Sequence, residues 1–156
     1  MSARGESEPA ARVREMLEHV VAAVDVPAEI EVTEDPSGLQ ANLAGDDLGL
    51  LIGRHGQTID AIQHLAYRIA YRGSDDRKRV TVDAAGYRAR RAALLQQDAD
   101  EAADEALSKD EPVALDAMNA VERRVVHEYL RDREGVETYS EGTEPDRHLV
   151  VAPSRD

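Results

Sequence analysis

The sequence contains no cysteine, phenylalanine or tryptophan, and its only lysines are Lys78 and Lys109. Without cysteine the chain can form no disulfide framework, thiolate zinc site or cysteine nucleophile. No apolar run approaches the roughly 20 residues that a membrane-spanning helix needs, and Met1 to Ala10 lacks the pattern of a secretory signal. Since the five tyrosines are the only aromatic residues, we expect small aliphatic cores in a cytoplasmic protein.

The 156 residues allow one ordinary domain or two small ones. With 19 basic and 32 acidic residues, the net charge is -13, which argues against a surface that attracts nucleic acid or anionic lipid everywhere. The charge is unevenly divided, because residues 46–91 have 9 cations and 6 anions, or +3. Screening acts over about 8 Å at physiological salt, so a local basic patch can act despite distant acids.

The first half of the sequence predicts a disordered tail over residues 1–8 and a domain over 9–85. Apolar residues at helical spacing indicate helices, and alternation indicates strands. In order, we expect a helix over 13–24, strands over 29–33 and 39–43, helices over 46–52 and 59–69, and a strand over 79–83.

Residues 86–156 predict a second small domain. We expect a long helix over 87–107, a brief strand over 111–115, a helix over 117–131, and strands over 136–142 and 148–151. In the helix over 117–131, the expected apolar stripe is Met118, Val121, Val125 and Tyr129. The predicted class is therefore α+β, with two small domains.

The segment Gly53-Arg54-His55-Gly56 separates two apolar helices. Glycines let a ligand approach the backbone closely, and the next helix presents the amides of Gln57, Thr58 and Ile59 at its positive end. Together with Arg54 they form a candidate site for a phosphodiester backbone, where Leu51, Ile52 and Ile59 could floor a groove for bases. A helix-turn-helix corner with two structural glycines is the alternative.

The sequence from Leu50 to Gln63 resembles the signature of a KH domain, and the order helix-strand-strand-helix-helix-strand resembles the type II arrangement. The resemblance implies that about four nucleotides of single-stranded RNA are held between the glycine loop and the sheet. His55 departs from the doubly basic loop common in this family. Because an imidazole is mostly neutral at pH 7, the substitution lowers the charge of the loop.

Arg123 and His127 are four residues apart, on one face of the helix over 117–131. Arg124 and Arg131 fall on the same side, so we expect all four side chains to face solvent and to offer a phosphate bidentate guanidinium contacts. A solvated helix, paired with Glu128 and nearby acids, is the alternative.

Three segments resemble the domain named for its Arg-x-x-x-His motif: Met118 to His127, Thr138 to Gly142, and Arg147 to Val151. The motif residues coincide with Arg123 and His127, and the resemblance implies binding of single-stranded nucleic acid, with Arg147 in the same site.

A KH domain followed by this second domain resembles the Jag family, also called KhpB or SpoIIIJ-associated proteins, over about residues 28–153. The resemblance implies a bacterial RNA-binding protein, an RNA chaperone or post-transcriptional regulator. It also implies a small KH-only partner, KhpA, and a link to cell elongation, division and envelope synthesis. Many members carry an N-terminal Jag domain, where this chain has only a short tail.

Tyrosines are candidates for base stacking. We expect Tyr67 and Tyr71 to pack inside the protein rather than to stack on bases, and Tyr139, beside the Arg-x-x-x-His helix, is the better stacking candidate.

Nothing in the sequence indicates a catalytic motif or cofactor. The five histidines show no metal-ligand spacing, and there is no P-loop or nucleophile elbow, so we expect no enzyme, metal or cofactor. A nuclease using His127 as a base is a lesser alternative. The acidic helix from Asp98 to Glu111 leaves open an adaptor that docks a basic protein, or a self-repelling spacer.

Overall fold

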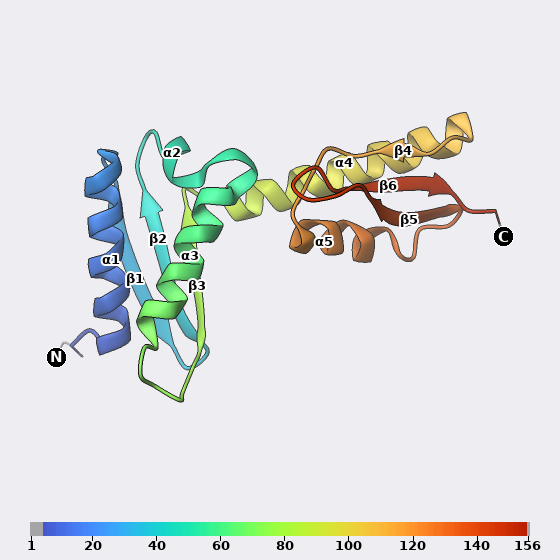
Figure 1. Cartoon of the computed structure of the whole chain (residues 1–156). Helices are drawn as coiled ribbons and strands as arrows, with labels where there is room; N and C mark the ends of the chain where they lie inside the picture. The colour runs from blue at the N-terminus through green and yellow to red at the C-terminus, as the bar shows by residue number, and fades with distance from the viewer. Residues whose placement is uncertain (1–4, 156) are drawn as a thin grey trace. The chain divides into compact units, whose positions relative to one another are not determined.

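The computed structural model describes residues 5–155 and divides into two compact units (Figure 1). The first unit ends at Arg88 and the second begins at Ala89, whereas the expected boundary lies between residues 85 and 86. Both units combine helices with a three-stranded sheet, so the predicted α+β class is confirmed.

The first unit has the element order that the sequence predicts. Its elements are α1 (Glu8–Val24), β1 (Glu29–Asp35), β2 (Gly38–Ala44), α2 (Gly49–Ile52), a 3-10 turn η1 (Arg54–Gly56), α3 (Gln57–Ala70) and β3 (Arg79–Ala84). Helix α1 already includes Glu8, because Ser7 caps it by accepting the Ala10 amide at 3.2 Å. Residues 1–4 of the expected tail lie outside the described residues.

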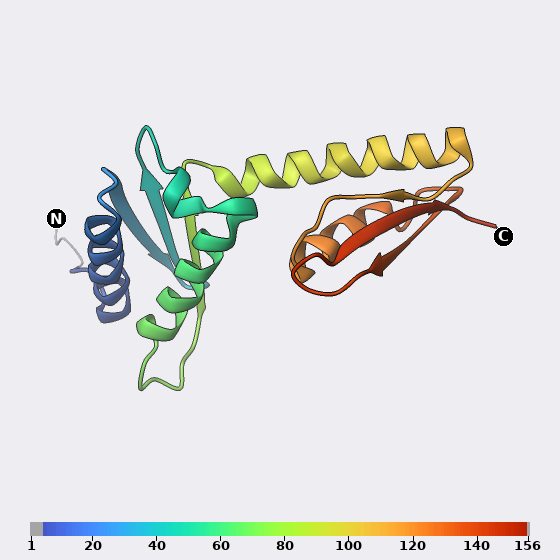
Figure 2. The ribbon, with the colours of Figure 1, turned by 45° about the horizontal axis from the view of Figure 1, so that its top comes forward.

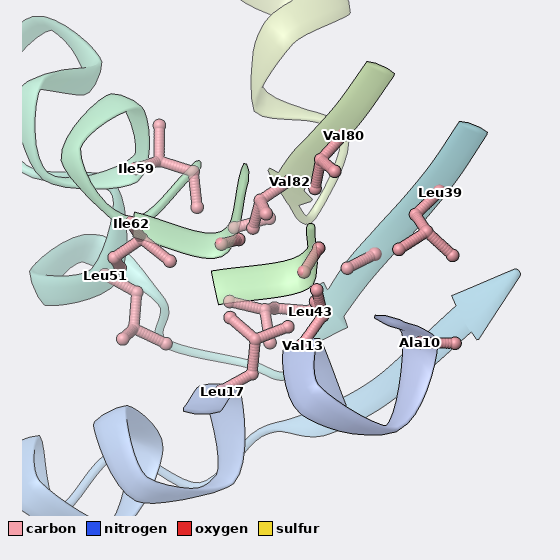
Figure 3. Close-up of a cluster of buried hydrophobic side chains, with 14 of the residues drawn as sticks. Ala10, Val13, Leu17, Leu39, Leu43, Leu51, Ile59, Ile62, Val80 and Val82 are labelled. Carbon is pink, nitrogen blue, oxygen red and sulfur yellow. The ribbon is translucent and has the colours of Figure 1, made fainter. Parts of the chain in front are cut away.

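The sheet of the first unit has the order β1-β2-β3, with an antiparallel first pair and a parallel second pair. In β2, Leu39, Ala41 and Leu43 are buried while Gln40 is exposed, as the alternation of a half-buried strand requires. Helices α1 and α3 contact each other and pack on the sheet. The core between them is mainly aliphatic (Figure 3), and includes Val13, Leu17, Leu43, Leu51, Ile59, Ile62, Val80 and Val82.

The second unit contains most of α4 (Tyr87–Lys109), then β4 (Val113–Ala114), α5 (Ala120–Leu130), β5 (Val136–Glu141) and β6 (His148–Pro153). The strands form an antiparallel sheet in the order β4-β6-β5. Small alanines of α4 and larger side chains of α5 and β6 make the core: Leu95, Ala99, Ala102, Ala103, Ala106, Met118, Val126, Leu130, Leu149 and Val151. Over residues 5–155, no helix is both long and apolar enough to cross a membrane.

The predicted apolar stripe of α5 is wrong for three of its four residues. Val121, Val125 and Tyr129 are 73%, 39% and 41% exposed, and only Met118 is buried. The buried residues of the helix are Glu122, Arg123, Val126 and Leu130. Three of them, all except Arg123, follow an expected position by one residue, which corresponds to a rotation of about 100°. Two ionised side chains can lie on this face because each has a partner; that of Glu122 is Arg91, at 2.8 Å.

Part of the acidic helix is used within the second unit. The Tyr129 hydroxyl donates to Asp100 at 2.9 Å, and this hydrogen bond raises the pKa of Tyr129. Arg133 pairs with both Asp100 and Asp104. These carboxylates therefore join α4 to the end of α5, while Asp98 and Glu101 remain exposed on the helix surface.

Candidate nucleic-acid interface

The glycine loop of the first unit has a backbone that only glycine fits at both ends. Gly53 and Gly56 have φ angles of 74° and 76°, in the region that side chains disfavour. Space is also lacking, since a Cβ at Gly53 would lie 2.2 Å from Thr58 Oγ1, and one at Gly56 would lie 2.7 Å from the Tyr87 ring. Glycine at these two positions therefore lets the loop turn tightly against Thr58 and Tyr87, while Arg54 between them stays exposed.

The loop leads directly into the positive end of α3. Gly56 occupies the N-cap position and supplies no side-chain cap. The Gln57 amide donates to the Arg54 carbonyl, so it is engaged in the 3-10 turn and is not available in the way the sequence predicts. The amides of Thr58 and Ile59 belong to the first turn, which an α-helix leaves without intrahelical partners.

Arg54 and His55 occupy the middle of the loop. Arg54 is exposed, and within the described part of the chain its side chain has no hydrogen bond or ion pair. His55 is half-buried and has a φ of 54°. The loop therefore presents one guanidinium beside the helix terminus.

The apolar groove floor that the sequence predicts is wrong for two of its three residues. Leu51 and Ile59 are completely buried in the core, so neither can touch a base. Ile52 is half-buried and packs against the same core, and Leu50, which was not expected at the site, is 69% exposed. Neighbouring residues of a helix point in different directions, so Leu50 of α2 faces solvent while Leu51 faces the core.

Sequence reasoning missed the residues that support this loop from behind. Arg88 donates to the Val82 carbonyl at 2.9 Å, to Asp60 at 2.8 Å and to Gln63 Oε1 at 2.9 Å. Gln63 Oε1 also accepts the Val82 amide at 3.0 Å. One guanidinium thereby ties α3 to β3, while the Tyr87 ring lies against Gly56.

The second unit has a pocket of about 390 Å³ between α5 and the strands β5 and β6. It brings together four of the predicted nucleic-acid contacts, Arg123, Arg124, His127 and Arg147. Arg131 is exposed beyond the end of α5 and does not line the pocket. The other lining residues are Ala120, Thr138, Tyr139, Ser140 and Leu149.

Arg123 does not face solvent as predicted. Its side chain is only 10% exposed, because Nη1 donates to the Met118 carbonyl at 2.6 Å and Nη2 donates to Glu144 at 2.7 Å. The guanidinium is thus already neutralised inside the protein, and Glu144 itself is 59% exposed.

Besides Arg123, the basic side chains of the pocket are Arg124 and His127, which are exposed, and Arg147, which is half-buried. The His127 Nδ1 contacts the Thr138 hydroxyl. Arg124 is 80% exposed and pairs with Glu128 at 3.0 Å, one turn along α5. Arg147 donates to the Gly142 carbonyl at 2.7 Å. These side chains offer a ring nitrogen and two guanidinium groups to an anion.

Tyr139 borders the pocket and is 44% exposed. It is paired with Val150, whereas Thr138 and Ser140 are paired with Val151 and Leu149. Because alternate residues of a strand point to opposite faces, the Tyr139 side chain stands on the sheet face opposite to Thr138. Any base stacked on it would lie on that face.

Tyr67 and Tyr71 of the first unit pack against each other edge to face, with ring centroids 6.4 Å apart. Tyr71 is buried, and Tyr67 packs against the same core. Among residues 5–155, no group of three histidine or carboxylate side chains is placed to hold a metal ion.

Comparison with known proteins matches one domain to each unit. Residues 12–83 match the family described as KhpA/KhpB, KH domain, and residues 93–153 match the domain family named for the Arg-x-x-x-His motif. The chain is 31% identical over 150 residues to RNA-binding protein KhpB of Bacillus subtilis, covering 95% of this chain and 72% of the relative. The chain belongs to the KhpB family.

Two further KhpB relatives are similar over most of the chain. The protein of Clostridium symbiosum is 37% identical over 144 residues, or 91% of this chain and 65% of the relative. The protein of Lactiplantibacillus plantarum is 36% identical over 143 residues, which cover 90% of this chain and 44% of that relative. The chain thus spans less than two thirds of the length of these two KhpB proteins.

Proposed function

We propose that this chain binds single-stranded RNA and that the Gly53–Gly56 loop grips the phosphates. The observation that carries the proposal is the shape of the loop, in which two glycines at positive φ lead the backbone into the positive end of α3 and the exposed Arg54 lies beside that end. Backbone amides and the helix dipole bind phosphate at such a terminus, and Arg54 adds a full charge. The KhpB relatives are named as RNA-binding proteins.

Bases that follow the gripped phosphates need an apolar surface. Since Leu51 and Ile59 are buried, the contacts available beside the loop are Ile52 and the exposed Leu50. Apolar side chains accept any base face, so this contact adds affinity with little preference for base identity.

The pocket of the second unit supplies a second contact. Arg124, His127 and Arg147 line it with exposed or half-exposed side chains, and its volume lies in the range of small-ligand sites. Two modules on one chain raise the overall affinity when both reach the same strand.

The decisive experiment titrates single-stranded RNA over a salt series with the wild type and the double variant Arg54→Asp, His55→Asp. Binding that weakens with salt shows phosphate contacts, and it should collapse in the loop variant. The matched control is Ser108→Asp, Lys109→Asp, which makes the same change in charge at two exposed neighbours in α4. Equal RNA affinity of the loop variant and the control contradicts the role of the loop.

For the second module, the variant is Arg124→Ala, Arg147→Ala. It should weaken binding of a long RNA and leave the free energy of unfolding nearly unchanged, because neither side chain is buried. Unaltered RNA affinity contradicts the role of the pocket.

We further propose a cytoplasmic RNA chaperone or regulator that works with a small KH-only partner of the KhpA type in cell elongation, division and envelope synthesis. Its support is membership of the KhpB family and the match of residues 12–83 to a domain family that covers both KhpA and KhpB. Capture of that KH-only protein after RNase treatment tests the partnership. If capture is lost with Asp98→Asn, Glu101→Gln, the acidic helix is the docking face.

A further inference from the structure

The outer face of α3 carries an exposed stripe that begins at the glycine loop. The stripe consists of Gln57, Ala61, His64, Leu65 and Arg68, and Arg72 continues it just beyond the helix. Residues three and four apart on a helix share a face. The only acid in α3 is Asp60, which is paired with Arg88, so the stripe contains no carboxylate.

The stripe ends at a basic cluster, which we define as Arg68, Arg72, Arg77, Lys78 and Arg79. Residues 68–79 contain these five cations and two acids, Asp75 and Asp76, so they hold the whole +3 of residues 46–91. The turn that follows α3 lies at the opposite end of this helix from the glycine loop (Figures 1 and 2), about 20 Å away along 14 residues. The net positive charge of residues 46–91 therefore lies at the end of α3 that is away from the glycine loop.

The cations of the basic cluster are available to an external anion. Within the described residues, none of the five side chains makes a hydrogen bond or an ion pair, in contrast to Arg88 and Arg91. The nearby Asp35 is engaged with Ser37, and this hydrogen bond is the main reason why the pKa of Asp35 is lowered. Lys78 contributes to that lowering by its charge alone.

We propose that the exposed stripe of α3 and the basic cluster form a track for single-stranded RNA that extends the footprint of the glycine loop. The inference rests on the proposed function, because the strand enters the track from the loop. Guanidinium groups of Arg68 and Arg72 contact successive phosphates, and Leu65, 52% exposed, gives bases an apolar surface. An RNA strand fits better than an acidic protein, because the stripe is continuous with the loop that we propose to hold phosphates.

The track predicts a dependence on RNA length. A KH loop alone holds about four nucleotides, so we compare oligonucleotides of roughly four, eight and twelve nucleotides with the wild type and with Arg68→Gln, Arg72→Gln. The variant should bind the shortest RNA normally and the longer ones roughly tenfold more weakly. Its salt slope on the longer RNAs should fall by about 1.4, because each single-strand phosphate contact contributes about 0.7.

The matched control is Lys109→Gln, Arg155→Gln, which removes the same charge from exposed positions of the second unit. The track is overturned if the α3 variant and the control have equal RNA affinities and equal salt slopes. It is also overturned if the α3 variant loses the same RNA affinity at every RNA length. If light scattering shows a wild-type dimer that the α3 variant abolishes, the stripe binds a second copy and not RNA. The loop variant Arg54→Asp, His55→Asp separates failure of the track from failure of the proposed function. If the proposed function is wrong, this variant binds RNA of every length as the wild type does.

Discussion

Arg123 donates from Nη2 to Glu144 over 2.7 Å, from a position on α5 to the connection between β5 and β6. The arginine side chain is 10% exposed and the carboxylate 59%, so the pair has a buried positive end and an exposed negative end. With the bond from Nη1 to the Met118 carbonyl, this arrangement gives the motif arginine two roles. It holds the second unit together, and it places at the edge of the pocket a guanidinium whose charge is balanced by Glu144.

Arg123→Ala should lower the free energy of unfolding by about 2 kcal/mol, because a buried carbonyl loses its donor and the alkyl chain loses its packing. Urea unfolding of the full chain measures the change. Arg124→Ala is the control, since that side chain is 80% exposed and should cost less than about 0.5 kcal/mol. Equal stability of the two variants would contradict the structural role of Arg123.

Glu144→Gln should strengthen RNA binding roughly tenfold, or by about 1.4 kcal/mol. Glutamine keeps an oxygen that accepts from Arg123, but it removes the negative charge that competes with a phosphate for the guanidinium. Fluorescence anisotropy with a labelled single strand measures the affinity.

Glu137→Gln serves as the control for that increase. It removes the same charge from an exposed position of β5, paired with Ala152 on the sheet face opposite to Thr138. If both variants gain equally, the effect reflects net charge. Weaker binding by Glu144→Gln would show that the carboxylate only positions Arg123.

Sequence patterns predicted the elements well, because strand alternation and helical spacing are local. They failed where burial depends on a specific partner. Arg123 is expected at the surface because it lies away from the predicted apolar stripe, yet Glu144, 21 residues later, makes its burial possible. The buried face of α5 was mispredicted for the same reason, because Glu122 also has a distant partner in Arg91.

The charge of residues 46–91 illustrates a different limit. A sum along the chain gives +3, but it does not say which end of α3 carries the charge. The supporting contacts of Arg88 were equally invisible, because its acceptors Asp60, Gln63 and Val82 are brought together only by the fold. By contrast, the glycine spacing at Gly53 and Gly56 was informative, since the backbone there tolerates no other residue.

Alanine substitutions at three glycines should separate backbone strain from crowding. Gly73 has a φ of 77° and no atom within 4 Å of the point that a Cβ would occupy, whereas Gly56 has a φ of 76° and faces the Tyr87 ring. Gly73→Ala should cost about 1 kcal/mol from the left-handed backbone alone. Gly53→Ala and Gly56→Ala should each cost at least about 1 kcal/mol more and weaken RNA binding, as urea unfolding and titration measure. Equal costs at all three sites would show that the loop has room to adjust.

Arg88→Lys should destabilise the first unit by about 2 kcal/mol, although the charge is kept. A lysine ammonium cannot reproduce the planar fork that reaches the Val82 carbonyl, Asp60 and Gln63 together, and lost hydrogen bonds to charged or buried partners cost about 1 to 3 kcal/mol each. Because Asp60 and Gln63 lie in the first two turns of α3, RNA affinity should fall as well. Arg68→Lys, at an exposed position of the same helix, should leave stability within about 0.5 kcal/mol. If Arg88→Lys changes the free energy of unfolding as little as Arg68→Lys does, the guanidinium does not fix α3 against β3. The orientation of the loop must then depend on the hydrophobic core alone.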